Sequence, residues 1–309
     1  MKKVLVLMSS YNGERFINEQ IDSILSQEEV DVHLLVRDDG SSDKTVCLLN
    51  EYVCRYPKQV DIILGNNVGY RNSFSALVEV AFEKFSNYDY FAFVDQDDTW
   101  HADKLKHAIS HLEKYDENIP NLYCSNSFLI DENGIKTGLF YNYIPRFTKG
   151  NTLFYPTLQG CSMVFNLAAC KLYVEHKPEG AIHDRWMFYI CSLLGNVFYD
   201  QEPRFNYRIH GNNQIGILPH YSLRDKLIRL YQMLFFKTTS SYYQEVEEFS
   251  EKFKGILSDH AQSLVDVYLS YPYNWSSKIK LIFSKEFGYK IPTFKEKSLH
   301  VIHVLRNKL

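Results

Sequence analysis

The sequence predicts an α/β protein with a mostly parallel central sheet, followed by a helical C-terminal region. Two observations predict this class. Short apolar runs alternate four times with amphipathic helical patterns within residues 1–115, as is typical of a parallel sheet covered by helices. From Tyr221 onward, apolar residues recur at helical spacing. With 45% hydrophobic and 23% charged residues, the composition of the 309-residue chain is that of a globular protein and excludes wholesale disorder.

Four strand and helix pairs follow one another along the first part of the chain. The expected strands are residues 4–8, 32–36, 60–64 and 90–94, and the helices after them are residues 16–25, 44–56, 73–85 and 104–115. The strands are continuous apolar runs, as expected when helices cover both faces of a sheet. Parallel strands need crossover connections, which the helices supply. Ligands bind such sheets beyond the carboxyl ends of the strands, where the polar segments of this sequence lie.

The remainder of the chain is less regular. A turn at Asp131–Gly134 separates two β-rich stretches, strands are expected at residues 163–165, 197–199 and 205–209, and a helix at residues 184–194. We therefore divide the chain into a first domain of residues 1–218, with halves 1–115 and 116–218, and a helical region of residues 219–309.

Charge and cysteine usage exclude several classes of protein. The net charge of −3 argues against a nucleic-acid binder, which is usually strongly basic. The charge is uneven, because residues 1–218 contain 20 basic and 28 acidic residues, whereas residues 219–309 contain 14 basic and 9 acidic residues. The six cysteines form no C-x-x-C pair and most have apolar neighbours. No apolar run is long enough for a membrane span or a signal peptide, so we expect a cytoplasmic location.

The strongest local signal is Asp95-Gln96-Asp97-Asp98, directly after the fourth expected strand. Three carboxylates in four residues repel one another unless they share a cation. Hard divalent ions prefer oxygen ligands, and Mg²⁺ is often held by one or two carboxylates together with phosphate oxygens. The alternative is a solvated acidic turn before the next helix.

Two other polar turns follow the first two strands. Asp38 and Asp39 end the second strand, where a carboxylate can accept hydrogen bonds from a base or a ribose. After the first strand, Tyr11 could stack on a base and Glu14 could bind a ribose. Each segment also has an ordinary interpretation, which is an Asx turn for the aspartates and a strand-to-helix turn for Tyr11 and Glu14.

Two later clusters complete the set of candidates. Asp184 opens an expected helix, where an aspartate is either a helix cap or a general base for an acceptor hydroxyl. Arg208 and His210 alternate at the end of an expected strand. They could hold a diphosphate, Arg208 by charge and His210 by a hydrogen bond or by ligating a metal.

Taken together, these segments resemble the family-2 glycosyltransferases, which are inverting enzymes with the Rossmann-like A-type nucleotide-diphospho-sugar fold. The resemblance covers about residues 1 to 215. It rests on stretches that occur in the family's order: residues 4–13, Asp38–Ser41, Asn67–Gly69, Asp95–Asp97, Lys104–Leu105, Gly160–Met163, His183–Asp184 and Tyr207–His210. The segments around Trp100, Trp186 and Asn212 look most like bacterial rhamnosyltransferases of cell-wall and capsule assembly. His183 departs from the family, because many relatives have Glu there.

The resemblance implies a role for each candidate. Tyr11, Glu14 and Asp39, or Asp38 in place of Asp39, border the base and ribose of a nucleotide-diphospho-sugar donor. Asp95 reaches the ribose or a metal, and Asp97 ligates Mg²⁺ or Mn²⁺. Asp184 is the catalytic base. Arg208 and His210 steady the departing diphosphate. Residues 1–115 then form the nucleotide-sugar half of the catalytic domain, and residues 116–218 form the acceptor half.

The resemblance implies the donor, the acceptor and the partners less directly than it implies the site residues. The narrower resemblance points to dTDP-L-rhamnose as donor and to a saccharide or lipid-linked saccharide as acceptor, with a UDP-hexose transferase, a sugar nucleotidyltransferase and a non-catalytic binding scaffold as alternatives. The basic tail combines aromatic and cationic residues, namely Trp275, Lys278, Lys280, Phe283, Lys285 and Phe287. It is either a peripheral membrane anchor or a helical cap on the body or on a partner subunit. The sequence predicts no particular oligomeric state.

Overall fold

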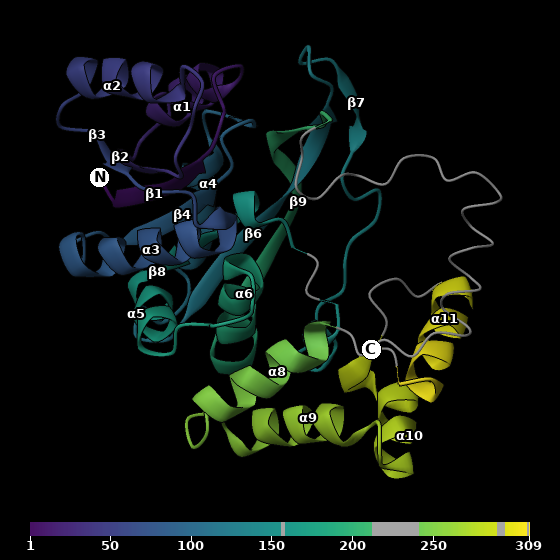
Figure 1. Ribbon diagram of the computed structural model, residues 1–309. Coiled ribbons are helices and arrows are strands. Elements are labelled where there is room, and N and C mark those ends of the chain that lie inside the picture. Colours follow the sequence, from purple (N-terminus) through teal and green to yellow (C-terminus); the bar gives the residue numbers. More distant parts are fainter. Residues whose placement is uncertain (156–157, 212–240, 289–293, 308) are drawn as a thin grey trace. The chain divides into compact units, whose positions relative to one another are not determined.

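The computed structural model describes residues 1–155, 158–211, 241–288, 294–307 and 309 (Figure 1). The chain forms two compact units. The first consists of residues 1–130, 136–144 and 156–208, and the second of residues 131–135, 145–155 and 209–309. The expected boundary at residue 219 and the helical pattern from Tyr221 lie outside the described residues.

Four parallel strands form the first half of the sheet in unit 1. They are β1 (Lys3–Ser10), β2 (Asp31–Asp38), β3 (Val60–Leu64) and β4 (Tyr90–Val94). Their order is β3-β2-β1-β4, so β1 lies between β2 and β4. Val4 is opposite Val32 on one side and Tyr90 on the other, and Ser10 is opposite Asp38 at the carboxyl end. The two acidic turns therefore leave the sheet from strands that both border β1.

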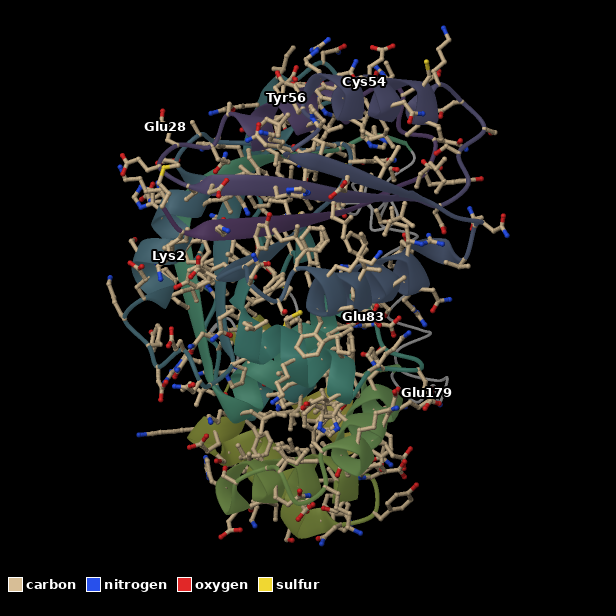
Figure 2. The ribbon with its side chains drawn as sticks, turned by 90° about the vertical axis from the view of Figure 1, so that its left-hand side faces the viewer. Lys2, Glu28, Cys54, Tyr56, Glu83 and Glu179 are labelled. Atoms are coloured by element: carbon tan, nitrogen blue, oxygen red, sulfur yellow. The ribbon has the colours of Figure 1, made fainter. Side chains whose placement is uncertain are left out.

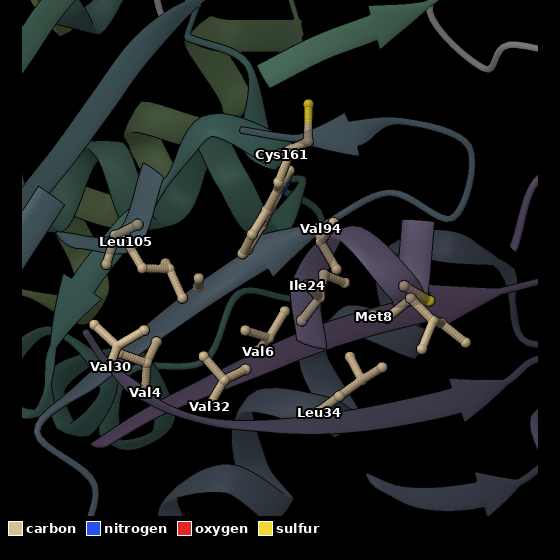
Figure 3. Close-up of a cluster of buried hydrophobic side chains, with 14 of the residues drawn as sticks. Val4, Val6, Met8, Ile24, Val30, Val32, Leu34, Val94, Leu105 and Cys161 are labelled. Carbon is tan, nitrogen blue, oxygen red and sulfur yellow. The ribbon is translucent and has the colours of Figure 1, made fainter. Parts of the chain in front are cut away.

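Helices cover both faces of these strands, as expected from the continuous apolar runs. The connecting helices are α1 (Ile17–Leu25), α2 (Thr45–Arg55), α3 (Gly69–Lys84) and α4 (Lys104–Leu112). On one face, Val4, Val6 and Met8 pack with Ile24 of α1 and Leu105 of α4 (Figure 3). α3 packs against β1 from the opposite face, where the ring of Phe74 meets that of Phe93 edge to face. The alternation of strand and helix predicted from the sequence is confirmed.

The second half of the sheet is mixed. It continues β4-β8-β6-β9-β5, and its strands are β5 (Thr99–Trp100), β6 (Asn121–Ile130), β7 (Lys136–Leu139), β8 (Val164–Asn166) and β9 (Asn196–Arg208). β8 runs antiparallel to both β4 and β6, and β7 pairs with β6. Two helices, α5 (Leu167–Glu175) and α6 (His183–Leu194), belong to this half. The sequence predicts α6 but not α5.

One expectation about the strands is wrong. Residues 197–199 and 205–209 were expected as two strands, but residues 196–208 form the single strand β9. The register with β6 shifts where Asp200 is opposite Ser125 and Pro203 is opposite Asn126. This irregularity lets β9 continue past a proline that breaks the alternation of side chains.

Unit 2 is helical in its C-terminal part, with α8 (Ser241–Lys252), α9 (Asp259–Ser270), α10 (Trp275–Phe283), the short 3-10 helix η3 (Lys285–Phe287) and α11 (Phe294–Leu305). Side chains at the N-caps begin two of these α-helices, α9 and α10. Ser258 Oγ accepts the Ala261 N–H at 3.3 Å, and Asn274 Oδ1 accepts the Ser276 N–H at 2.9 Å. A second 3-10 helix, η1 (Asn151–Leu153), belongs to the same unit.

Two further properties of the fold concern the state of the cysteines and the apolarity of the helices. All six cysteines are free thiols, and Cys124, Cys161, Cys170 and Cys191 are buried. Cys47 and Cys54 are exposed on α2, and Cys54 projects from the edge of the molecule (Figure 2). Among the helices of the described residues, none combines the length and apolarity needed to cross a bilayer.

Candidate active site

The loop after β1 is held by the acidic turn after β4. The side-chain amide of Gln96 pairs with the backbone of Tyr11, because the Tyr11 N–H donates to Gln96 Oε1 at 2.9 Å and Gln96 Nε2 donates to the Tyr11 carbonyl at 3.0 Å. A Cβ atom at Gly13 would lie 2.3 Å from Gln96 Oε1, so a larger residue there would displace the Gln96 amide from Tyr11. The Tyr11 side chain remains 48% exposed. This loop therefore presents an aromatic ring on a fixed backbone.

Glu14 lies in the same loop and binds the start of α2. Its Oε2 accepts the Lys44 N–H at 2.9 Å, and its own N–H donates to Asp43 Oδ2 at 3.1 Å. A carboxylate at a helix N-terminus satisfies an unpaired N–H and interacts favourably with the helix dipole. The carboxylate of Glu14 thus has a structural partner, in addition to the ribose contact predicted for it.

Asp38 is almost completely buried, and four donors from the protein surround its carboxylate. Oδ1 accepts the N–H groups of Gly40 at 3.2 Å and Ser41 at 2.8 Å. Oδ2 accepts the hydroxyls of Ser10 at 3.0 Å and Ser41 at 2.6 Å. The turn after β2 is therefore built around this side chain, as the Asx-turn interpretation expects.

Asp39 connects the same turn to the start of α3. Its carboxylate forms an ion pair with Arg37 and accepts the N–H groups of Val68 at 3.0 Å and Gly69 at 2.8 Å. Gly69 has a φ of +80°, a conformation that favours glycine. Asp39 is buried as well, so both carboxylates of this turn are engaged by the protein itself.

The turn after β4 is different, because its carboxylates approach one another and a thiol. Ligand atoms of Asp95, Asp98 and Cys161 all lie within 4.8 Å of one another. Burial and the neighbouring charges of Asp97 and Asp184 raise the pKa of Asp95 to about 7. Burial together with Asp97 and Asp95 holds the pKa of Asp98 well above its usual range. The structure thus brings together the acidic residues Asp95, Asp97, Asp98 and Asp184, which we call the acidic cluster.

Asp98 belongs to the acidic cluster and is fully buried. Its Oδ1 accepts the Arg208 N–H at 3.0 Å, while its Oδ2 has no hydrogen-bond partner among the described residues. A buried carboxylate oxygen without a partner is costly. Carboxylate oxygens that lie this close together suit a hard divalent cation as its ligands, so the residues present fit Mg²⁺ or Mn²⁺.

Arg208, the last residue of β9, braces the acidic turn. Besides its N–H bond to Asp98, its Nε donates to the Asp97 carbonyl at 2.8 Å. The guanidinium forms an ion pair with Glu19 at 2.5 Å and lies over the ring of Phe16, 4.6 Å from its centroid. The side chain is 2% exposed, so in this structure it positions the turn. Its contact with a diphosphate stays a prediction.

Asp184 is the second residue of α6 and faces η2 (Gly160–Ser162), the segment that contains Cys161. A Cβ at Gly160 would lie 3.0 Å from Asp184 Oδ2, so the absent side chain leaves room for the carboxylate. Burial raises the pKa of Asp184. Its Oδ1 accepts the Arg185 N–H at 2.7 Å. This carboxylate therefore reaches the acidic cluster from a second element.

His183 holds the start of α6 in the core. Its ring stacks on Phe74 with 3.9 Å between centroids and meets Phe93 edge to face at 4.8 Å. Burial lowers its pKa to about 3, so the imidazole is neutral at pH 7. His183 therefore provides packing beside Asp184.

Sequence reasoning missed three residues of this site. Gln96 joins two loops, Cys161 lies in the acidic cluster, and Lys104 is buried below it. The Lys104 ammonium lies 3.8 Å from the centroid of the Trp100 ring and has no hydrogen-bond partner among the described residues. Burial lowers its pKa to about 7, against the opposing effect of Cys161, Cys124 and Asp98. The one sequence signal for these three residues is that each lies within a stretch that resembles the family-2 glycosyltransferases.

His210 is the remaining candidate. It lies two residues beyond the end of β9, in the second unit, whereas the acidic cluster lies in the first. Its role as a metal ligand therefore stays a prediction.

A sheet with a parallel half and a mixed half, a crowded acidic cluster beyond β4 and an exposed aromatic ring beyond β1 together define an α/β protein with a candidate active site beyond the carboxyl ends of its parallel strands. The sequence model of the family described as Glycosyl transferase family 2 matches residues 5–173. The chain belongs to this family and is a glycosyltransferase.

Individual proteins support the same assignment. The chain is 32% identical over 221 residues to the dTDP-rhamnosyl transferase RfbG of Shigella flexneri, which covers 68% of this chain and 73% of that protein. Residues 1–349 of S. aureus TarS in complex with UDP-GlcNAc superpose with a TM-score of 0.60 at 15% identity, covering 99% of this chain and 80% of that one. The mannosyltransferase PcManGT from Pyrobaculum calidifontis, in complex with GDP-Man and Mn²⁺, has a TM-score of 0.50 at 13% identity, covering 98% and 86%. These structures share the A-type fold.

Proposed function

We propose that this glycosyltransferase is a metal-dependent inverting enzyme that transfers L-rhamnose from dTDP-L-rhamnose to a saccharide or lipid-linked saccharide during cell-surface polysaccharide synthesis. The acidic cluster is the observation that carries the proposal, because its crowded carboxylates suit both a divalent ion and a catalytic base. The choice of donor is supported by the identity of 32% to a dTDP-rhamnosyl transferase. We further propose residues 1–218 as the catalytic domain.

Asp184 is the proposed base. It removes the proton from the acceptor hydroxyl as that oxygen attacks the anomeric carbon from the face opposite the diphosphate. Burial raises its pKa, which makes it a stronger base than a solvated aspartate. A single displacement inverts the anomeric configuration and needs no nucleophile from the protein.

Asp95 and Asp97 are the proposed metal ligands, with His210 as a third. Mg²⁺ or Mn²⁺ bound there would neutralise the charge that develops on the departing diphosphate. Asp98 and Arg208 keep the turn in place, because the carboxylate of Asp98 accepts the Arg208 N–H. We also propose that Arg208 contributes its positive charge near the diphosphate.

Donor binding is proposed for the loops beyond β1 and β2. Tyr11 supplies an exposed ring on a fixed backbone, which suits stacking on the base. Asp38, Asp39 and Glu14 already bind backbone groups of the protein. We propose that all three shape the base and ribose pocket. Asp38 does so by holding its turn, while Glu14 and Asp39 contact the ribose through the lone pairs that remain to them.

The test of this function is the Asp184→Asn variant, assayed with dTDP-L-rhamnose and a panel of UDP- and GDP-sugars. The amide keeps the size of the side chain but cannot accept the proton. We expect turnover to fall about 100-fold or more, since general base catalysis contributes roughly that much, while dTDP binding is retained. The matched control is Glu179→Gln, an exposed carboxyl just before α6, which should leave turnover unchanged (Figure 2). Near-normal turnover of Asp184→Asn would remove the base assignment. A preference for a UDP-hexose would change only the proposed donor and would leave the base assignment in place.

A further inference from the structure

The helix α10 buries one side in its unit and exposes a row of apolar residues on another side. Leu281 is fully buried and Ser277 is 4% exposed, and α10 packs against α9 and α11. The other side exposes Trp275 at 67%, Ile279 at 55% and Phe283 at 79%. These residues are four apart, so they lie in one row along the helix. Tyr273, just before the helix, is 88% exposed. We call these four residues the α10 stripe.

Cations accompany the α10 stripe. Lys280 and Lys285 are exposed beside it, and the Lys278 ammonium lies 5.0 Å from the centroid of the Trp275 ring. The nine residues of α10 include no acidic side chain. The structure also changes the set of residues that the sequence suggested for an anchor. Phe287 and Lys278 are buried at 3% and 8% exposure, and Ile279 and Tyr273 are exposed instead.

The chemistry of the α10 stripe distinguishes a lipid surface from a protein partner. Protein interfaces are enriched in Arg and depleted in Lys, whereas the exposed cations that accompany the α10 stripe in the described part of the chain, Lys280 and Lys285, are lysines. Exposed Trp and Tyr next to Lys are typical of helices that lie at the boundary between lipid headgroups and acyl chains. The positive charge is complementary to anionic headgroups, which attract basic residues near the surface.

We propose that the α10 stripe is a docking surface for an anionic phospholipid bilayer. Trp275, Ile279 and Phe283 enter the headgroup region, and Lys280 and Lys285 contact anionic headgroups. Binding of this kind requires no catalysis, so the proposal stands independently of the sugar, the acceptor and the metal.

The experiment is co-sedimentation of the full chain with phosphatidylcholine vesicles, with and without phosphatidylglycerol. We expect binding to the anionic vesicles that weakens with salt. The Trp275→Ser/Phe283→Ser variant should lose roughly tenfold in affinity for each ring removed. Lys280→Gln/Lys285→Gln should lose about fivefold for each lysine, and only on anionic vesicles. The matched control is Ile256→Ser, which removes a 44%-exposed apolar side chain of the same unit outside α10 and should bind like the parent chain.

Tryptophan fluorescence provides a second measurement that does not depend on folding of the variants. Trp100 and Trp186 are buried, so Trp275 is the tryptophan that a quencher can reach. Brominated phosphatidylglycerol should quench its emission, and Trp275→Phe should abolish the effect. The proposal is overturned if the chain does not bind anionic vesicles or if the stripe variant binds as the parent does. It is also overturned if Trp275 is shielded without lipid in a dimer or partner complex that Phe283→Ser dissolves.

Discussion

Asp38 ends β2 and Asp39 follows it, while Asp95, Asp97 and Asp98 follow β4, so two acidic turns leave the sheet from strands that both border β1. In the first turn, each carboxylate oxygen accepts hydrogen bonds from the protein. In the second turn, Asp98 Oδ2 has no hydrogen-bond partner among the described residues, and burial and mutual repulsion raise the pKa values of Asp95 and Asp98.

The difference separates two uses of the same residue type. A carboxylate whose two oxygens both accept hydrogen bonds from the protein stabilises a loop. Its removal should lower the free energy of unfolding. Carboxylates that crowd one another destabilise the fold, and such strain persists at functional sites. Counting the hydrogen bonds of each oxygen therefore distinguishes a structural aspartate from a candidate metal ligand.

The largest expected effect is that of Asp95→Asn. The amide removes a negative charge from the acidic cluster, so we expect turnover to fall roughly 100-fold or more. Removal of one of several repelling charges should at the same time raise the free energy of unfolding by about 1 kcal/mol at pH 8. Steady-state kinetics and urea denaturation measure the two effects.

Divalent ions supply the control for this variant. Mn²⁺ should raise the melting temperature of the parent chain, because a ligand that binds only the folded state stabilises it. The melting temperature of Asp95→Asn should respond much less. Full turnover of the parent in EDTA would contradict a metal role for the acidic cluster.

The opposite pattern is expected for Asp38→Ala. The substitution leaves the N–H groups of Gly40 and Ser41 and the hydroxyls of Ser10 and Ser41 without their buried acceptor. Buried unsatisfied groups are costly, so we expect the free energy of unfolding to fall by about 3 kcal/mol. Urea denaturation measures this loss. A variant of unchanged stability that had lost only dTDP binding would show Asp38 to be a ligand contact, and the contrast between the two turns would fail.

Local pattern was enough to predict the parallel half of the fold. The runs at residues 4–8, 32–36, 60–64 and 90–94 form β1 to β4, because apolar strands and amphipathic helices are encoded by neighbouring residues. Elements that depend on distant partners were not predictable. β5 consists of Thr99 and Trp100 and exists only through its pairing with β9. α5 is short and presents little contrast between its faces.

Prediction of the candidate site is limited in the same way, because parts of the site depend on partners that are distant in the sequence. Charge density alone marked the turn at Asp95–Asp98, since three acidic residues within four positions are unusual after a buried strand. Sequence could not distinguish it from the turn at Asp38–Asp39, because the donors that saturate Asp39 come from Val68 and Gly69 on another loop. Cys161 and Lys104 reach the site from separate elements, so only tertiary structure joins them to it.

The smallest expected effect on stability is that of His183. This buried base extends the contrast between groups with and without hydrogen-bond partners in the protein. Its Nδ1 has no hydrogen-bond partner among the described residues, and burial lowers its pKa to about 3. The unfolded chain takes up a proton near pH 6.5, while the folded chain does not. Stability is therefore lost as the pH falls from about 6.5 toward 3, and the loss at pH 5 should be roughly 2 kcal/mol.

His183→Phe removes this titration and keeps an aromatic ring against Phe74 and Phe93. The difference in unfolding free energy between the variant and the parent should therefore shift by roughly 2 kcal/mol in favour of the variant between pH 7.5 and pH 5, as urea denaturation at each pH measures. All other titrating groups are common to the two chains and cancel in this difference. A difference that does not change with pH would mean that the imidazole takes up its proton at the same pH in the folded and the unfolded chain. His183 would then belong with the charged groups beside Asp184, and not with the packing of α6.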